Sequence, residues 1–409
     1  MTSGSLAGVP TRLLDPYQHA TVLLVSLLVV MVGLDLRYRF GVSLTLVAAL
    51  VVLPLWARSV GRYPLAPLIV GLGLASTVSA IVLAERSAVD HSINSLVQTE
   101  TIFLFLSGLA ALVILLWARE VLPLHRIVVL YAVGALASDI LASRMSWKYD
   151  LSLPAALLVL GLMERHGIRR ASAAVLMGFG LIGVLNDSRS FIAFCAMAAA
   201  LTLWELRPIT SSQSRWFPAM LMVCLGVATY LLVQSLLVGG YLGSVAQERT
   251  IEQSDATGSV LAGGRPEWAA TRALVLLNPA GYGVGVKPNW SDLQAAKQGL
   301  NAINVDLETH RERYMFGTVF NLHSITSDLW VGYGWTGVAL AIVICFALVR
   351  SLSFQLAARA APTSVILLAM LGVWFMLFGP FYSNWLEVCV SLGLVLVTRA
   401  AGSPVTPHD

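Results

Sequence analysis

The stretch ASAAVLMGFGLIGVLNDSRSFIAFCAMAAALTLWEL, residues 171–206, consists of two long apolar runs separated by a short polar turn. Apolar runs of this kind are typical of helices that enter a bilayer, whose hydrocarbon core is about 30 Å thick. The turn holds an acid and a cation, Asp187 and Arg189, at the edge of the apolar segment. A guanidinium is costly at that depth, so its position calls for an explanation.

The same pattern extends over the whole chain, which is 57% hydrophobic, only 12% charged and has a mean hydropathy of +0.78. Soluble domains of ordinary composition do not approach these values. We therefore expect an all-α polytopic membrane protein with about twelve transmembrane helices. Several runs are short for a perpendicular span, which predicts that one or two are re-entrant or strongly tilted. The predicted spans lie near 19–36, 41–57, 65–84, 99–118, 127–143, 150–163, 171–186, 190–206, 217–240, 325–349, 363–380 and 383–400.

The arginines of the short loops predict the orientation, because cytoplasmic loops carry the excess of Arg and Lys. Placing both termini in the cytoplasm gives the cytoplasmic side most of these arginines. The long segment 241–322 and Arg189 then lie at the outer face of a cytoplasmic (inner) membrane. The first apolar run lacks a small-residue cleavage site and is followed at once by another span, so we do not expect a cleavable signal peptide.

Other classes of protein find little support in the sequence. We expect one transmembrane domain, 1–409, with the extracytoplasmic loop 241–322 inserted between the ninth and tenth spans. The four cysteines lie inside apolar runs without a C-x-x-C pair, which indicates packing. Metal-ligand spacing is absent, so neither a metal nor a cofactor is expected. The net charge of +4 reflects the cytoplasmic arginines rather than a nucleic-acid partner.

The long loop is predicted to be ordered because it contains GGRPEWAATRALVLLNP at 263–279. Pro266 suits a first helical turn, and Pro279 ends the helix by restricting the residue before it. Its apolar side chains suit a helix that lies against the membrane domain along the membrane surface; they are Trp268, Ala269, Leu276 and Leu277.

The rest of the loop carries further local signals. The glycine-rich GYGVGV at 281–286 follows no strand, so close backbone packing is a better interpretation than a dinucleotide fingerprint. Residues 289–302 and 304–315 predict two further short helices.

Three basic residues flank the predicted outer face: Arg189, Arg265 and His323. Arg189 could be a snorkelling anchor, and Arg265 an exposed loop residue. However, Arg265 precedes a helix start, where backbone N–H groups bind anions such as phosphate. A single histidine near a membrane is more often interfacial than catalytic. Ser327 would share a helix face with His323, but nothing in the spacing supports a hydrolytic triad.

Three segments in this order resemble the O-antigen ligase and polysaccharide polymerase superfamily. NDSRSFIAFCAMAAALTLWEL (186–206) resembles its S-R-[SG] helix start. GGRPEWAATRALVLLNPAGYGVGV (263–286) resembles its G-R-x-x-x-W, N-P, G-x-G stretch, with the tryptophan one position nearer the arginine. LHSITSDLWVGYGWTGVAL (322–340) resembles its H-[NS] segment, although VGYGWTG replaces the usual E-x-G-x-x-G.

The resemblance implies a metal-independent glycosyltransferase of the C type, whose loop roofs a lateral opening to lipid. It would transfer a glycan from a polyprenyl diphosphate donor to the hydroxyl of a lipid or glycan acceptor. The phosphate-binding arginines of the family correspond to Arg189 and Arg265, and its essential histidine to His323. Asp187 would orient the Arg189 guanidinium or cap the turn, and Trp268 and Ser327 would support the site.

This chemistry agrees with the residue types. A diphosphate leaving group develops negative charge that two guanidiniums and a helix start could stabilise. A neutral histidine could act as base for the acceptor hydroxyl. Arg189 would then lie at the apolar boundary because the diphosphate of a lipid donor lies at that depth.

Two alternatives stay open, and a third is discounted. A repeat-unit polymerase of the same superfamily would have two substantial outer loops, whereas only 241–322 is long here, which favours ligation. A transporter of lipid-linked glycans would have two related halves, which the sequence lacks, although Asp139 in ALASDILAS lies within a span as a hydrogen-bond partner or proton site. A polyprenyl-monophosphate glycosyltransferase would carry an acidic pair in the first outer loop, where LDLRYRF has Asp35 alone.

Overall fold

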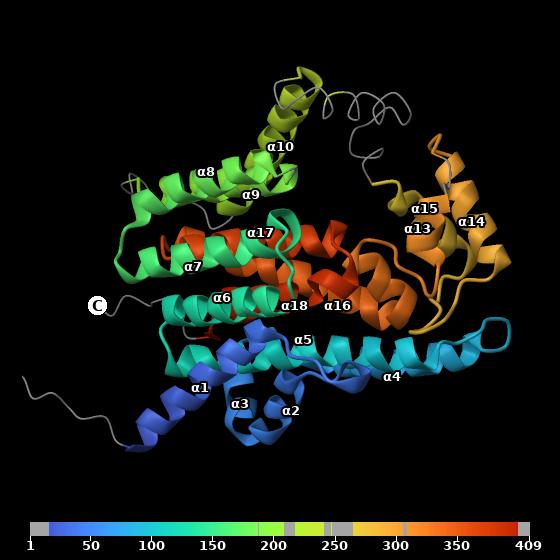
Figure 1. Cartoon of the computed structure of the whole chain (residues 1–409), viewed down its shortest axis with the longest axis horizontal. Coiled ribbons are helices and arrows are strands. Elements are labelled where there is room, and N and C mark those ends of the chain that lie inside the picture. Colours follow the sequence, from blue (N-terminus) through green and yellow to red (C-terminus); the bar gives the residue numbers. More distant parts are fainter. Residues whose placement is uncertain are drawn as a thin grey trace, which may run out of the picture.

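The computed structural model describes residues 16–186, 188–207, 217–240, 247, 265–305 and 309–399. Every regular element among these residues is a helix, and most of the helices run roughly parallel in one bundle (Figure 1). Five of the described helices are long and apolar enough to cross a membrane: Tyr17–Leu34, Ala66–Ser87, Ser95–Val121, Leu124–Leu141 and Ile325–Ala357. The expectation of an α-helical membrane protein is therefore confirmed, while the count of about twelve spans stays a prediction.

The helices follow the apolar runs closely. The N-terminal part comprises α1 (Pro16–Leu34), η1 (Arg39–Gly41), α2 (Leu44–Val51), α3 (Leu53–Val60), α4 (Ala66–Ser87), α5 (Ser95–Val121) and α6 (Leu124–Leu141). The middle comprises η2 (Trp147–Leu151), α7 (Ser152–Arg165), α8 (Arg169–Leu185), α9 (Arg189–Glu205) and α10 (Phe217–Val238). The remainder comprises α13 (Glu267–Leu277), α14 (Trp290–Asn301), α15 (Thr309–Phe316), α16 (Ile325–Ala357), α17 (Thr363–Phe378) and α18 (Phe381–Val395).

The prediction of a single span at 41–57 is wrong. This run forms α2 and α3, each 8 residues long, which meet at Val52. Pro54 lies in the first turn of α3, where its missing N–H ends the α2 hydrogen-bond ladder. A helix of 8 residues is about 12 Å long and cannot cross about 30 Å of hydrocarbon.

Helix α5 is the centre of the bundle. Its residues from Leu109 to Ala118 are all buried, and it packs against α18, α3, α2 and α1. The Trp385 ring of α18 stacks on Phe105 at a centroid distance of 5.0 Å and donates its indole N–H to the Phe105 carbonyl at 2.9 Å. Outward-facing apolar side chains on α1, α4 and α8, such as Leu23, Val78 and Leu181, are exposed, which suits contact with lipid.

The helices of the long loop form a second packed unit. Figure 1 shows α13, α14 and α15 together at one end of the bundle, opposite the end where the C-terminus is marked. A separate buried cluster joins them to the ends of α4 and α16, and it includes Leu274, Leu300, Met315 and Trp330. The predicted helices at 263–279 and 289–302 are confirmed, because α13 begins after Pro266 and ends before Pro279, and α14 follows. Of the predicted helix 304–315, residues 304–305 are not helical, 306–308 lie outside the described residues, and α15 begins at Thr309.

The side chains that we expected to pack α13 against the membrane domain face elsewhere. Trp268, Leu276 and Leu277 are exposed, and the buried residues of α13 include Ala270 and Leu274. This prediction failed because α14 packs on α13 and selects the buried face of that helix. The location of α13 along a membrane surface stays a prediction.

The glycine-rich turn packs as expected, with its backbone directly against helices of the bundle. A Cβ atom at Gly283 would lie 2.2 Å from the Ala84 nitrogen, and the residue has φ of +101°. The neighbouring backbone is held by α16, since Tyr282 and Gly283 both donate N–H groups to the Val331 carbonyl. Only a glycine meets both the conformation and the space at this position.

A histidine links this loop unit to the turn between α4 and α5. His91 Nδ1 lies 2.6 Å from Asp90 Oδ1, and its Nε2 lies 2.9 Å from Asp292 Oδ2 of α14. The Tyr282 hydroxyl donates to the other oxygen of Asp292 at 2.8 Å. Burial by itself lowers the pKa of His91, but the hydrogen bonds and charges of Asp90 and Asp292 outweigh it, and the pKa is raised.

We predict that Gly283→Ala destabilises the protein by about 2 kcal/mol or more, because the methyl group would overlap the α4 backbone and φ would be strained. Gly71→Ala, on helix α4 itself, is the control, because a Cβ atom at Gly71 would meet nothing within 4 Å. Thermal unfolding in detergent measures both. Equal melting temperatures for the two variants would contradict close packing of the turn.

We predict that His91→Gln costs more stability at pH 6 than at pH 8. Because the folded pKa of His91 is raised, the stability it contributes is fully present below its unfolded pKa of about 6.5 and is lost as the pH rises through the folded pKa. The measurement is the difference in melting temperature between parent and variant at each pH. A difference that grows with pH would show that His91 is held in its neutral form.

Candidate functional site

A cavity of about 990 Å³ lies between α1, α6, α7, α9, α17 and α18. Arg265 and His323, which are predicted site residues from different segments, both line it. Ser188 and Ser190, on either side of Arg189, line it as well. Arg189 is the first residue of α9, but its side chain, like all of Asp187, lies outside the described residues.

The Arg265 guanidinium lies over aromatic rings. Its Cζ atom is 5.6 Å from the ring centroid of Trp374 and 5.6 Å from that of Phe378, both on α17. The expected helix start follows directly, because α13 begins at Glu267 and no side chain caps its first turn. A guanidinium on aromatic faces keeps its charge and directs its N–H groups sideways, which leaves it able to bind an anion.

His323 has an unusual backbone conformation. Its φ of +53° lies in the left-handed region, two residues before α16 begins at Ile325. Such a conformation persists in a residue other than glycine only where its surroundings hold it. The expectation that His323 and Ser327 share a helix face is therefore wrong, because His323 precedes the helix and its N-cap residue Ser324.

The carboxylate of Asp328 holds this segment in place. Its Oδ1 accepts the Leu322 N–H at 2.7 Å, and its Oδ2 accepts the Phe381 N–H at 3.1 Å. The first of these donors immediately precedes His323, and the second opens α18. Asp328 thus fixes His323 relative to α18. The second residue of this helix, Tyr382, lines the cavity.

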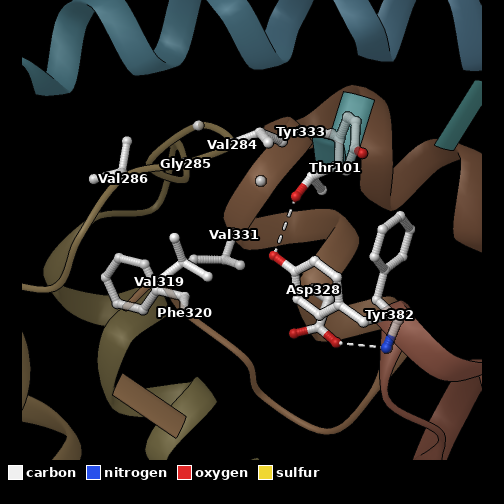
Figure 2. A pocket seen from close by; sticks show the side chains of 13 residues that line it. Thr101, Val284, Gly285, Val286, Val319, Phe320, Asp328, Val331, Tyr333 and Tyr382 are labelled. Atoms are coloured by element: carbon white, nitrogen blue, oxygen red, sulfur yellow. Dashed lines mark hydrogen bonds between the residues drawn. The ribbon is translucent and has the colours of Figure 1, made fainter. Parts of the chain in front are cut away.

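Figure 2 shows the space beside Asp328, a small cavity of about 30 Å³ below the glycine-rich turn. Thr101 and Tyr382 point toward each other across it, and the Thr101 hydroxyl donates to the Tyr382 oxygen at 3.4 Å. Tyr382 also lines the large cavity, so it forms part of the wall between the two.

The end of α17 is tied to the start of α16. The Met376 carbonyl accepts hydrogen bonds from the hydroxyls of Thr326 at 2.8 Å and Ser324 at 3.3 Å. These bonds hold the end of α17, whose rings Trp374 and Phe378 lie against the Arg265 guanidinium, close to the segment that contains His323.

The surroundings of His323 favour its neutral form. Its pKa is lowered, first because burial disfavours the charged imidazolium, while the charge of Glu267 raises it and that of Arg265 lowers it. Its Nδ1 is buried and has no hydrogen-bond partner among the described residues. A neutral imidazole that lines a cavity can accept a proton there.

Two predicted supporting residues are not part of this site. Trp268 is 38% exposed, and neither Trp268 nor Ser327 lines the cavity. Ser327 is buried, with its N–H on the Ser324 hydroxyl, and its own hydroxyl has no partner among the described residues. Both lie on helices whose rotation about their axes turns these side chains away from the cavity.

The wall of the cavity also carries ion pairs. Arg37 pairs with Asp35, and Arg144 lies 3.1 Å from Asp139, with all four residues lining the cavity. Asp139 was expected deep within a span, but it lies in the last turn of α6, which ends at Leu141.

Sequence reasoning missed Glu267 and Tyr314 as neighbours of His323. Glu267 was visible in GGRPEW, but an acid in a first helical turn is explained by the helix dipole. Tyr314 carried no signal, because its position beside the histidine depends on how α15 folds back onto the segment before α16.

Comparisons with protein-family models, curated proteins and solved structures find no match to the chain.

We predict that Asp328→Asn destabilises the protein by about 1.5–3 kcal/mol, since the amide can accept from only one of the two backbone donors without turning its own N–H groups on the other. Ser327→Ala, one residue earlier, removes a hydroxyl that has no partner among the described residues and should change stability little. The measurement is the melting temperature of both variants in detergent. A harmless Asp328→Asn would mean that the carboxylate does not hold this segment.

Proposed function

We propose that the protein is a glycosyltransferase that moves a glycan from a polyprenyl diphosphate donor to an acceptor hydroxyl, without a metal, at the outer face of the cytoplasmic membrane. The ligase type of the O-antigen ligase superfamily is the best candidate. The observation that carries the proposal is that Arg265 and His323, which lie far apart in sequence, line one cavity within a helical membrane protein.

Each part of the cavity has a role in this chemistry. Arg265, together with Arg189 at the start of α9, would bind the diphosphate of the donor. The aromatic residues Phe194, Trp374 and Phe378 give the cavity an apolar side that suits the first isoprene units. The ion pairs of the cavity wall offer hydrogen-bonding groups to a glycan.

The transfer is a displacement at the anomeric carbon. The acceptor oxygen attacks this carbon. The bond between the anomeric carbon and the diphosphate oxygen breaks, and its electron pair leaves with the diphosphate. The hydroxyl proton passes to the neutral imidazole of His323. Arg265 stabilises the charge that develops on the leaving group, and burial strengthens this interaction.

The test uses purified protein, a lipid-linked glycan donor and a choice of acceptors. Arg265→Ala should lower turnover roughly tenfold to a hundredfold, because it removes a charged hydrogen bond worth about 1.5–3 kcal/mol. Arg272→Ala is the matched control, since this arginine is exposed on α13 and does not line the cavity. His323→Ala should lower turnover by about 10²–10⁴.

Product length separates the two members of the superfamily. A ligase adds one finished glycan to an acceptor of different chemistry, whereas a polymerase produces a ladder of repeat units. Transfer at the parental rate by both Arg265→Ala and His323→Ala would refute the proposal. Movement of intact donor across the bilayer by His323→Ala would favour a transporter instead.

A further inference from the structure

Glu267 is a buried carboxylate beside the candidate site. It is the first residue of α13 and only 9% exposed. The helix dipole favours an acid in the first helical turn, but this interaction does not require the carboxylate to be buried. Burying a carboxylate is costly unless a nearby group compensates. The burial of Glu267 therefore needs a second reason.

That reason lies in what Glu267 contacts. Its Oε1 accepts the Tyr314 hydroxyl at 2.5 Å, and the Tyr314 ring meets the His323 ring edge to face, with 4.4 Å between centroids and an interplanar angle of 65°. Its Oε2 is buried without a hydrogen-bond partner among the described residues. Tyr314 thus joins the carboxylate and the imidazole into one cluster.

His323 is surrounded by charged and polar groups from several elements. Arg265 and Glu267 act on it from the start of α13, the phenol of Tyr314 from α15, and Asp328 of α16 binds the backbone next to it. The side chain of Arg189 on α9 lies outside the described residues. The Trp374 and Phe378 side chains of α17, which also line this part of the cavity, are uncharged. The charge of Glu267 favours the protonated imidazole and opposes that of Arg265.

We propose that Glu267, held by Tyr314, is a positioning residue that stabilises the imidazolium formed when His323 takes the acceptor proton; this inference rests on the proposed function. The same cation that binds the diphosphate would otherwise repel the protonated histidine. Glu267 itself gains no proton and forms no bond in the step, because the proton stays on His323 until the product leaves. Its carboxylate acts through charge and through the Tyr314 contact.

The first measurement needs no glycan donor. The protonation of His323 is followed by NMR in protein with labelled histidine, and His323→Gln assigns its signal. Glu267→Gln keeps an oxygen that can accept the Tyr314 hydroxyl but removes the charge, so the pKa of His323 should be lower than in the parent. Glu312→Gln, an exposed acid on α15, is the matched control and should leave the titration unchanged.

The second measurement is the pH dependence of transfer. In Glu267→Gln the acid limb of the rate profile should move to lower pH, and turnover at the plateau should fall about tenfold, with KM for the donor unchanged. Glu267→Asp restores the charge and should recover part of the turnover. Tyr314→Phe, which keeps the ring but frees the carboxylate, should lose part of it as well.

The two proposals fail in different ways. If Glu267→Gln and the parent titrate alike at His323, the role of Glu267 is refuted, although transfer by the parent would still support the proposed function. If the parent transfers no glycan to any acceptor, the proposed function is refuted even when the titration of His323 shifts as expected. A loss of turnover in Glu267→Gln with an unshifted acid limb would reduce Glu267 to a structural residue.

Discussion

The carboxylate of Asp328 binds two backbone N–H groups from distant parts of the chain, and the geometry of the site depends on it. A helix that begins inside a membrane protein has N–H groups that water cannot reach, so a side chain must satisfy them. Asp328 does this for the start of α18 and also for the residue before His323. One buried acid therefore ties the start of α18 to the segment that carries His323.

The site that results balances opposing electrostatic demands. Burial and Arg265 both disfavour a charged His323, which keeps the imidazole free to accept a proton but weakens it as a base. The Arg265 guanidinium lies over the rings of Trp374 and Phe378, which attract a cation through their faces. Glu267 acts in the opposite direction on the same imidazole. A low-dielectric cavity strengthens all of these effects, so small changes in charge should be felt there.

Much of the fold follows from patterns that act over a few residues. Hydropathy gave the positions of most helices, and Pro266 and Pro279 bounded α13 because proline begins and ends helices for local reasons. The glycine-rich turn was recognisable for the same kind of reason. The prediction of one span at 41–57 failed because it followed hydropathy and did not take account of Pro54, which divides this apolar run into two short helices.

The candidate site was only partly predictable. Arg265 and His323 could be selected by residue type and position, and they line one cavity. Trp268 and Ser327 were selected by the same reasoning and do not line it, because a sequence does not specify how a helix is rotated about its axis. Glu267 and Tyr314 were missed because their importance arises from a contact between α13, α15 and the segment before α16.

By itself, then, the sequence determined that the chain is a helical membrane protein and where most helices run, and it selected Arg265 and His323 as candidate site residues. These properties depend on the apolar content of short segments and on the fixed geometry of proline and glycine. Only the tertiary structure decided that Arg265 and His323 line one cavity, that Asp328 fixes the histidine, and that Glu267 reaches it through Tyr314. Apart from the bond between Asp328 and the nearby Leu322 N–H, those contacts join residues distant in the chain, so they are set by how whole helices pack.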